Sequence, residues 1–161
     1  MNKVTFRDIV NVEDKLLIKK ILERTTFFIK EEVDLALSLF DEYFDKGSKS
    51  GYNFLFILVN EEVVGYTCFG HIEGTQSSFD LYWIAIDPKF QNLGLGHKLL
   101  KRSEEIALTM GAGRIYIETS SRAKYRPTRE FYQHSGYNLE SVLKDYYRKR
   151  DNKCIYVKRL S

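Results

Sequence analysis

The chain has 161 residues, of which 43% are apolar, and its 25 Lys and Arg against 22 Asp and Glu give a formal net charge of +3. A chain of this length can bury about two thirds of its unfolded surface, so one domain over residues 1–161 is expected. The near balance of charge does not by itself argue for a nucleic-acid partner, and none is expected. No apolar run reaches the roughly 18 residues that a membrane-spanning helix needs, which argues against a membrane partner.

The N-terminus and the cysteines favour a cytoplasmic protein. Residues 1–14 mix charged and isolated apolar residues and lack the pattern of a secretory signal. The two cysteines, Cys68 and Cys154, lie in apolar, strand-like stretches without CxxC spacing, so both are expected to be reduced and buried. The three histidines are scattered without metal-ligand spacing, so no metal site is expected.

The first part of the chain predicts a strand followed by two helices. Alternation around Val4 and Phe6 is typical of a strand, and Asn11 with Asp14 three residues later matches a helix-capping pattern. Two helical periods follow, through Leu17, Ile21 and Leu22 and through Val33, Leu37, Phe40 and Phe44. The Gly- and Ser-rich segment 45–53 predicts a loop.

After this loop the pattern predicts strands over residues 54–59, 63–72 and 79–86, which resemble an antiparallel meander. Pro88 ends the third strand because it cannot donate to a ladder. One helical face then runs through Leu95, Leu99, Ile106, Ala107 and Met110, with Gly111 and Gly113 after it.

The remaining residues predict a strand over 115–119, a short helix capped by Thr128 and ending at His134, and two strands over 137–147 and 154–160. The whole pattern indicates a mixed α/β or α+β fold, with a single layer of sheet and helices on its faces.

The clearest chemical signal is the run QNLGLG at residues 91–96, between an apolar strand and an amphipathic helix. The start of a helix presents unpaired backbone N–H groups and a partial positive charge, which suit a phosphate, and glycines let that backbone come close. The spacing fits neither a Walker loop nor a dinucleotide fingerprint, because Leu99 stands where a third small residue is needed. A tight strand-to-helix turn without a ligand is the alternative interpretation.

This run and its flanks resemble the GNAT superfamily of acyl-CoA-dependent N-acetyltransferases. The turn matches the family pattern of Gln or Arg, two variable residues, Gly, one variable residue, and Gly or Ala, and LYWIAIDPKFQNLGLGHKLL resembles the family's central motif throughout. Downstream, REFYQHSGY is similar to the second signature, a short helix with an aromatic pair and a closing Gly-aromatic step. The two segments cover residues 79–137. The resemblance implies a twisted, mostly antiparallel sheet of about six to seven strands flanked by about four helices.

The resemblance also implies acetyl-CoA as the co-substrate. In the family, backbone N–H groups of the turn bind the pyrophosphate of CoA, and the pantetheine arm pairs with the preceding strand. By position this assigns CoA to Ile84, Ala85, Ile86, Gln91, Asn92, Leu93, Gly94, Leu95, Gly96 and His97. Lys98, Lys101 and Arg102 add charge that could reach the CoA phosphates, with Lys98 the candidate among them, although a solvated helix face fits each of the three better.

Tyr132, the second aromatic residue of the FY pair, matches the position that usually protonates the CoA thiolate in this family. A phenol with a pKa near 10 keeps its proton at neutral pH and can supply it. The alternative is a helix residue that only packs its ring.

Two carboxylates are candidates for the base. Asp80 falls where the histone-modifying branch of the family has its catalytic glutamate, but aspartate is shorter, and its unperturbed pKa near 3.9 suits a water relay. Glu118, at the end of a strand, is a rival, and a solvated strand carboxylate is the alternative for both. The oxyanion donor is expected among the backbone N–H groups of the strand over 84–86.

The implied function is transfer of the acetyl group of acetyl-CoA to a primary amine by direct attack within a ternary complex. The alternative is a non-catalytic acetyl-CoA-binding or protein-interaction domain of the same fold, and either fits a monomer or a homodimer. A small molecule or a protein amine can be the acceptor, because the first two helices and the loops that choose it diverge freely in the family.

Three charged segments have both a functional and an ordinary interpretation. Acidic residues of the second helix suit a cationic amine or a soluble helix surface: Glu31, Glu32, Asp34, Asp41 and Glu42. The stretch 125–129 suits the border of the acceptor site or a helix start. Arg148, Lys149, Arg150 and Lys153 suit a solvated hairpin turn better than a nucleic-acid contact.

Overall fold

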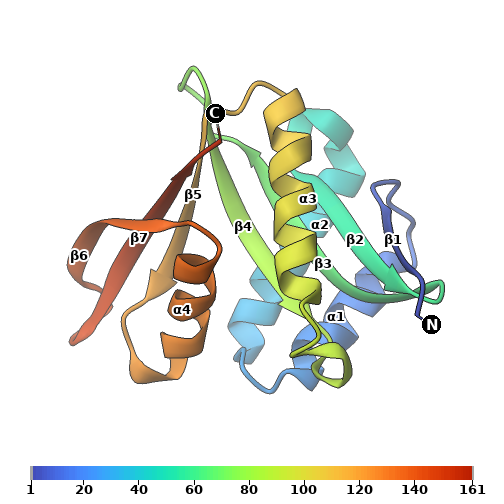
Figure 1. Cartoon of the computed structure of the whole chain (residues 1–161), viewed down its shortest axis with the longest axis horizontal. Helices are drawn as coiled ribbons and strands as arrows, with labels where there is room; N and C mark the ends of the chain where they lie inside the picture. The colour runs from blue at the N-terminus through green and yellow to red at the C-terminus, as the bar shows by residue number, and fades with distance from the viewer. Residues whose placement is uncertain (1, 161) are drawn as a thin grey trace.

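A twisted, seven-stranded sheet in the order β1-β2-β3-β4-β5-β7-β6 forms the centre of the protein in the computed structural model, which describes residues 2–160 (Figure 1). The strands are β1 (Val4–Arg7), β2 (Asn53–Val59), β3 (Glu62–His71), β4 (Ser78–Ile86), β5 (Arg114–Ser120), β6 (Asn138–Arg148) and β7 (Asp151–Arg159). The helices are α1 (Asp14–Arg24), α2 (Lys30–Lys46), α3 (Leu95–Thr109) and α4 (Arg126–His134). Only β4 and β5 pair in parallel within the described sheet. The predicted α+β fold is confirmed.

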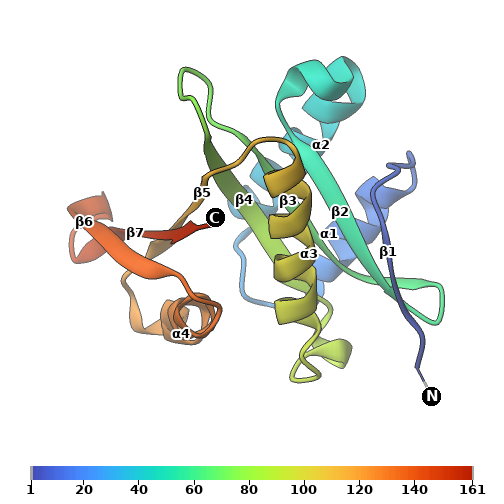
Figure 2. The same cartoon turned by 45° about the horizontal axis from the view of Figure 1, so that its top comes forward.

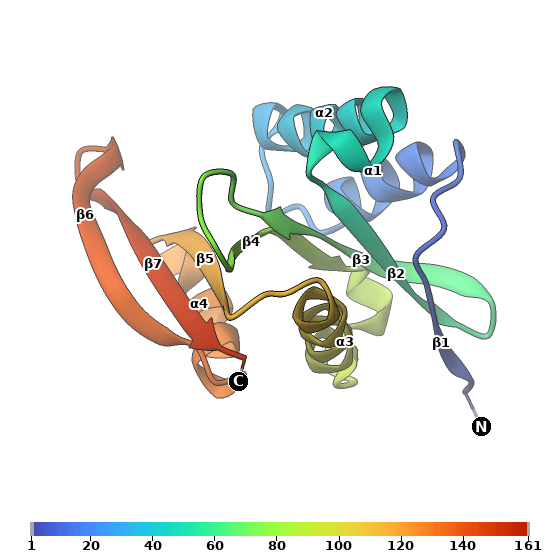
Figure 3. The same ribbon diagram turned by 90° about the horizontal axis from the view of Figure 1, so that it is seen from above.

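Helices cover both faces of the sheet, with α1 and α2 on one face and α3 and α4 on the other (Figure 3). Each helix turns its apolar stripe towards the strands, so two buried clusters result. One joins Leu99 of α3 and Tyr132 of α4 to the sheet, and the other joins Ile21 of α1 and Phe40 of α2 to it. Within residues 2–160, no helix is long and apolar enough to cross a membrane.

The parallel strands β4 and β5 stay together over a short distance only. Residues 78–80 pair with residues 114–116, and the two strands then diverge towards their C-terminal ends (Figures 1 and 2). The wedge, as we call this opening, lies between residues 81–86 of β4 and 117–120 of β5. Within the wedge, β4 is bonded to β3 on one side, so the backbone N–H and C=O groups of its other side are open to a ligand.

A β-bulge reorients β4 where the wedge begins. Tyr82 has no partner on β3, because its neighbours Leu81 and Trp83 pair with consecutive residues of that strand. Leu81 and Ile84 both pack in the cluster under α3, although a regular strand would point residues three apart to opposite faces. The bulge thus keeps the second half of β4 packed on α3 while its edge leaves β5.

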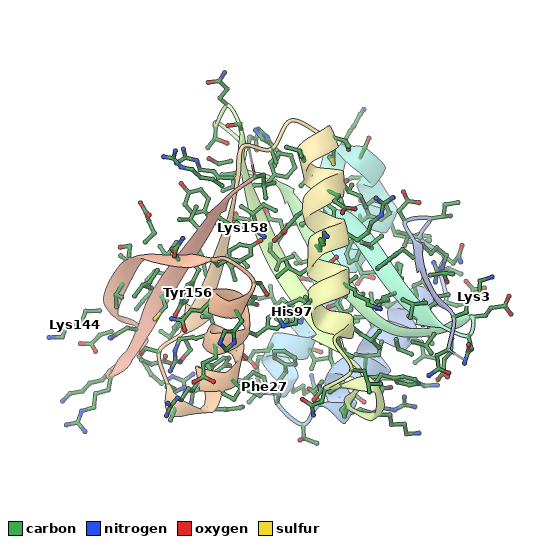
Figure 4. The ribbon with its side chains drawn as sticks, in the orientation of Figure 1. Lys3, Phe27, His97, Lys144, Tyr156 and Lys158 are labelled. Carbon is green, nitrogen blue, oxygen red and sulfur yellow. The ribbon has the colours of Figure 1, made fainter. Side chains whose placement is uncertain are left out.

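A partly buried ion pair ties the outer strands to α3 across the wedge. The Glu104 carboxylate of α3 accepts hydrogen bonds from the Tyr137 hydroxyl and from Nζ of Lys158, each at 2.8 Å. Lys158, on β7, also donates to the carbonyl oxygen of Ser135 at 3.0 Å (Figure 4). These contacts position β7 and the end of α4 independently of the short β4–β5 ladder.

Two helix starts differ from the sequence prediction. α4 begins at Arg126, so Thr128 lies inside the first turn and does not cap it. Tyr125 is the N-cap residue, and its side chain makes no hydrogen bond to the first turn of the helix. α1 begins at Asp14, later than a cap at Asn11 predicts. The Asp14 carboxylate nevertheless accepts a hydrogen bond from the backbone N–H of Asn11 at 2.7 Å, which is the reciprocal half of a capping box.

Two other segment ends were also predicted wrongly. Met110 lies beyond the end of α3 and is exposed, because Gly111 takes a left-handed conformation there. Lys153 belongs to β7 and not to the hairpin turn, and its ammonium group pairs with the Glu118 carboxylate at 2.7 Å. The basic residues of this hairpin are therefore divided between the two strands and the turn at residues 149–150.

Gly65→Ala should lower the free energy of unfolding by about 1–3 kcal/mol, the range for an overpacked core. A Cβ atom at Gly65 would lie 2.5 Å from Cδ1 of Ile86 and 2.7 Å from the carbonyl oxygen of Ala85, and that backbone oxygen cannot move without moving β4. Urea denaturation measures the loss, with Glu62→Ala on the exposed end of β3 as the control. A loss in Gly65→Ala no larger than in the control would contradict the packing argument.

Candidate active site

A cavity lies in the wedge. Its volume of about 800 Å³ is within the size range of small-molecule sites. Its walls come from residues 82–86 of β4, residues 118–120 of β5, the turn before α3, the start of α4, the α1–α2 loop and the β6–β7 hairpin. Segments distant in the sequence therefore meet here. No group of three or more His, Cys, Asp or Glu side chains within residues 2–160 is placed to hold a metal ion.

The turn before α3 presents free backbone donors to this cavity. Gly94 has φ of 76°, in the left-handed region that favours glycine, and directly precedes the helix. The first hydrogen bond of the helix runs from the N–H of Lys98 to the carbonyl of Gly94, so the N–H groups of Leu95, Gly96 and His97 have no partner inside the helix. These donors and the helix dipole together suit an anion.

Close packing fixes the turn on both sides. A Cβ atom at Gly96 would lie 3.2 Å from Cε1 of Phe131, so α3 approaches α4 closely only because this residue is glycine. The His97 ring packs at a tilt against the Phe131 ring, with ring centroids 4.6 Å apart, and its Nδ1 lies 2.9 Å from Oγ of Ser135 (Figure 4). The N-terminus of α3 is thus held in place by α4.

Polar contacts fix the chain where it enters the turn. The Asp87 carboxylate accepts hydrogen bonds from the backbone N–H of Lys89 at 3.1 Å and from Nη1 of Arg24 at 2.6 Å. The Gln91 side chain donates to the carbonyl oxygen of Ile86 at 3.1 Å. The last residue of β4 and the end of α1 therefore both position the turn.

Tyr132 lies on the opposite wall, on the face of α4 that packs against the sheet. Its side chain is buried, lines the cavity and contacts the rings of Tyr137 and Tyr156. Burial raises the pKa of the Tyr132 phenol above its usual value, so the group keeps its proton at neutral pH.

The two candidate carboxylates differ in environment. Asp80 is the last residue of β4 that pairs with β5, so it stands at the apex of the wedge. Burial, and then the charge of Glu118, raise the pKa of Asp80 to about 6, while Lys153 lowers it. Glu118 lines the cavity itself, and its carboxylate is occupied by Lys153.

The α1–α2 loop closes the open end of the wedge. The rings of Phe27 and Tyr125 meet edge to face at 4.7 Å, and the Tyr125 hydroxyl donates to the Glu32 carboxylate at 3.2 Å. Nζ of Lys124 lies 4.7 Å from the centre of the Phe27 ring and donates to the carbonyl oxygen of that residue. These contacts join the two sides of the wedge and form an aromatic wall of the cavity.

Comparison with known proteins assigns the chain to a family. The profile of the acetyltransferase (GNAT) family matches residues 17–137, which is most of the chain and includes the turn before α3 and all of α4. The chain belongs to the GNAT acetyltransferase family. A search of curated protein sequences finds no significant match.

Solved structures agree with the family. A GNAT-family acetyltransferase structure from Desulfovibrio desulfuricans is 40% identical, with a TM-score of 0.96 over 99% of this chain and 100% of that chain. An aminoglycoside 6'-N-acetyltransferase complexed with coenzyme A has 17% identity and a TM-score of 0.78, over 99% of this chain and 97% of that chain. The Salmonella typhimurium protein yncA, solved with acetyl-CoA, has 18% identity and a TM-score of 0.73 over 98% and 94%. The last two show the shared fold.

The GNAT motif residues lie together in the structure. The residues assigned to CoA that line the cavity are Ile84, Ala85, Ile86, Gln91, Asn92, Gly94, Leu95, Gly96 and His97. The side chains of Leu93 and Lys98 are exposed and lie outside the lining, as does Asp80. Of the stretch 125–129, Tyr125, Pro127 and Thr128 line the cavity.

Other lining residues of this GNAT chain were not predicted from the sequence. They come from the α1–α2 loop, the β5–α4 loop and the β6–β7 hairpin, among them Phe27, Phe28, Arg122, Lys124, Tyr147 and Asp151. The pair of adjacent aromatic residues between two helices was the available signal for the first loop. The hairpin residues had no local signal, because only the curvature of the sheet brings them to the wedge.

Asp80→Asn should change how stability depends on pH. In the wild type the folded protein keeps the Asp80 proton up to about pH 6, while the unfolded chain loses it near pH 3.8, so the stability contribution of this group falls as pH rises through that window. The variant lacks this fall and should gain stability relative to wild type between pH 4 and pH 7, measured by urea denaturation. A carboxyl-carbon NMR titration of Asp80 with a midpoint near pH 4 would contradict the burial argument.

Proposed function

We propose that this GNAT protein is a cytoplasmic N-acetyltransferase that passes the acetyl group of acetyl-CoA to a primary amine within a ternary complex. The observation that carries the proposal is the turn before α3, where free backbone donors and the helix dipole face a cavity beside the open edge of β4. An anionic ligand with an extended, amide-containing arm fits both features. CoA, with its diphosphate and pantetheine, is such a ligand.

Each part of the site then has one role in binding. The N–H groups of Leu95, Gly96 and His97 bind the diphosphate, whose charge the helix N-terminus favours. The open edge of β4 in the wedge bonds to the pantetheine amides as a neighbouring strand would. Together they direct the thioester towards the bulge at Tyr82, at the apex of the wedge.

The reaction needs a neutral amine, stabilisation of an oxyanion and an acid for the leaving group. The amine nitrogen attacks the acetyl carbonyl, backbone N–H groups of β4 stabilise the tetrahedral oxyanion, and the carbon–sulfur bond breaks. Tyr132 gives its proton to the departing thiolate. Its burial keeps that proton in place until the thiolate forms.

A base must remove a proton from the amine, because only about one lysine-type amine in a few thousand is neutral at pH 7. Asp80 suits this role better than Glu118. Its raised pKa of about 6 lies near the working pH, whereas the Glu118 carboxylate is held by Lys153. Since Asp80 is outside the cavity lining, it acts through water.

Gly94→Ala should weaken CoA binding about 10-fold or more, because an alanine strained at positive φ relaxes the turn and misdirects its N–H groups. Gly74→Ala is a matched control: Gly74 also has positive φ, 84°, and both positions have nothing within 4 Å of an added Cβ. Both variants should lose similar stability, and calorimetry should find weaker CoA binding in Gly94→Ala only. Undetectable CoA binding in the wild type would refute the proposed function.

Tyr132→Phe should lower kcat for acetyl transfer about 100-fold or more, with the dissociation constant of CoA within about threefold of wild type, because general acid catalysis contributes about 10²–10⁴. Free-thiol release over a panel of amines measures the rate, and calorimetry measures CoA binding. Tight CoA binding without thiol release for any amine in the wild type would favour the non-catalytic alternative. An unchanged kcat would remove Tyr132 from the mechanism.

A further inference from the structure

The cavity has a second end, away from the N-terminus of α3. The β6–β7 hairpin curves towards the face that α1 and α2 cover, and α3 and α4 lie on the other face (Figure 3). Arg148 and Asp151, on either side of the hairpin turn, line this end of the cavity. Ser120, the last residue of β5, and Arg122, just after the strand, line it as well. If CoA enters beside α3, the acceptor occupies this second end.

Arginine side chains outnumber carboxylates here. The buried Asp151 carboxylate accepts a hydrogen bond from the Ser120 hydroxyl, and it pairs with Nε of Arg122 at 3.2 Å and with Nε of Arg148 at 3.7 Å. Nη1 of Arg129 donates to the carbonyl oxygens of Ser120 and Arg122, each at 2.8 Å. Two guanidinium groups thus pair with one carboxylate, and a third bonds to backbone carbonyl oxygens beside it, which leaves a local excess of positive charge.

The other acidic residues of the cavity do not offset this excess. Glu118 pairs with Lys153, and Glu32 accepts hydrogen bonds from the Tyr125 hydroxyl and from the backbone N–H of Ile29. Three of the acidic residues of α2 that could attract a cation are paired with lysines: Asp41 with Lys15, Asp34 with Lys30, and Glu42 with Lys46. A polycationic acceptor would therefore have to displace an existing partner from each of these five carboxylates, those of Glu118, Glu32, Asp41, Asp34 and Glu42.

We propose that the acceptor is an amine that also carries a carboxylate, and that Arg148 binds this carboxylate. The inference rests on the proposed function and adds the chemical class of the acceptor. A guanidinium group binds a carboxylate through two parallel hydrogen bonds, and the Arg148 side chain is 63% exposed, so it can turn from Asp151 to a ligand. Arg122 stays paired with Asp151, so the charge of the Asp151 carboxylate remains neutralised while the Arg148 guanidinium group binds the ligand.

The test compares amines that differ only in the carboxylate. Free-thiol release from acetyl-CoA is followed with γ-aminobutyrate and its amide, with the peptide amides Ala-Asp and Ala-Asn, and with spermidine. The carboxylate member of at least one pair should have a kcat/KM about 10-fold or more above its amide partner, as expected for a charge-assisted bidentate contact. Preference within the first pair points to a free amino acid, and preference within the peptide pair alone points to an acidic peptide.

Arg148→Gln should reduce this preference to about twofold or less, while Lys149→Gln, in the adjacent turn and outside the cavity lining, should keep it. Both variants should bind CoA like the wild type. Equal or better use of the amides or of spermidine by the wild type overturns the proposal. So does an equal loss of rate for both members of each pair in Arg148→Gln.

Binding measurements separate this inference from the proposed function. Calorimetry with each carboxylate and its amide, on the free and the CoA-loaded protein, measures the preference without turnover. If CoA does not bind, the proposed function fails, and the acceptor result still stands on the free protein. If CoA binds and neither turnover nor binding distinguishes carboxylate from amide, the acceptor class is wrong and the proposed function is unaffected.

Discussion

The early separation of β4 from β5 is the constraint on which the other features of the site depend. After residues 78–80 have paired with 114–116, two strands that could continue as a ladder diverge, which leaves one edge of β4 unbonded. Unpaired backbone groups shielded from water are costly, so such an edge persists only where water or a ligand reaches it. The cavity in the wedge provides that access, and it brings the helix N-terminus of α3 and the phenol of Tyr132 to the same space.

Packing on either side holds the wedge open. The inner strands are fixed to α3 through the apolar cluster around Leu99, and the bulge at Tyr82 lets β4 keep that contact beyond the point of separation. The outer strands are fixed separately, through Glu104 with Lys158 and Tyr137. Since both sets of strands are attached to one helix, closing the wedge would require disrupting either an apolar core or a partly buried ion pair with its buried Tyr137–Glu104 hydrogen bond, and each is costly.

The sequence predicted those features that depend on local chemistry. The turn at residues 91–96, the order of strands and helices, and the position of Tyr132 follow from glycine spacing, periodicity and the family motifs. The bulge was missed, although two consecutive aromatic residues, Tyr82 and Trp83, interrupt the alternation there. The cluster around Asp151 could not be predicted, because it depends on how far β6 and β7 curve, and the basic residues of that hairpin gave no sign that a buried carboxylate lies among them.

The same physical effect prepares two groups of the site for opposite roles. Burial penalises a charged form, so it raises the pKa of both the Tyr132 phenol and the Asp80 carboxylate. For the phenol this means that the proton stays on at neutral pH, as an acid requires. For the carboxylate it brings the pKa to about 6, where the group is still largely ionised at pH 7 but binds a proton more readily than an exposed aspartate. In the proposed mechanism, a partly buried wedge thus supplies both the acid and the base.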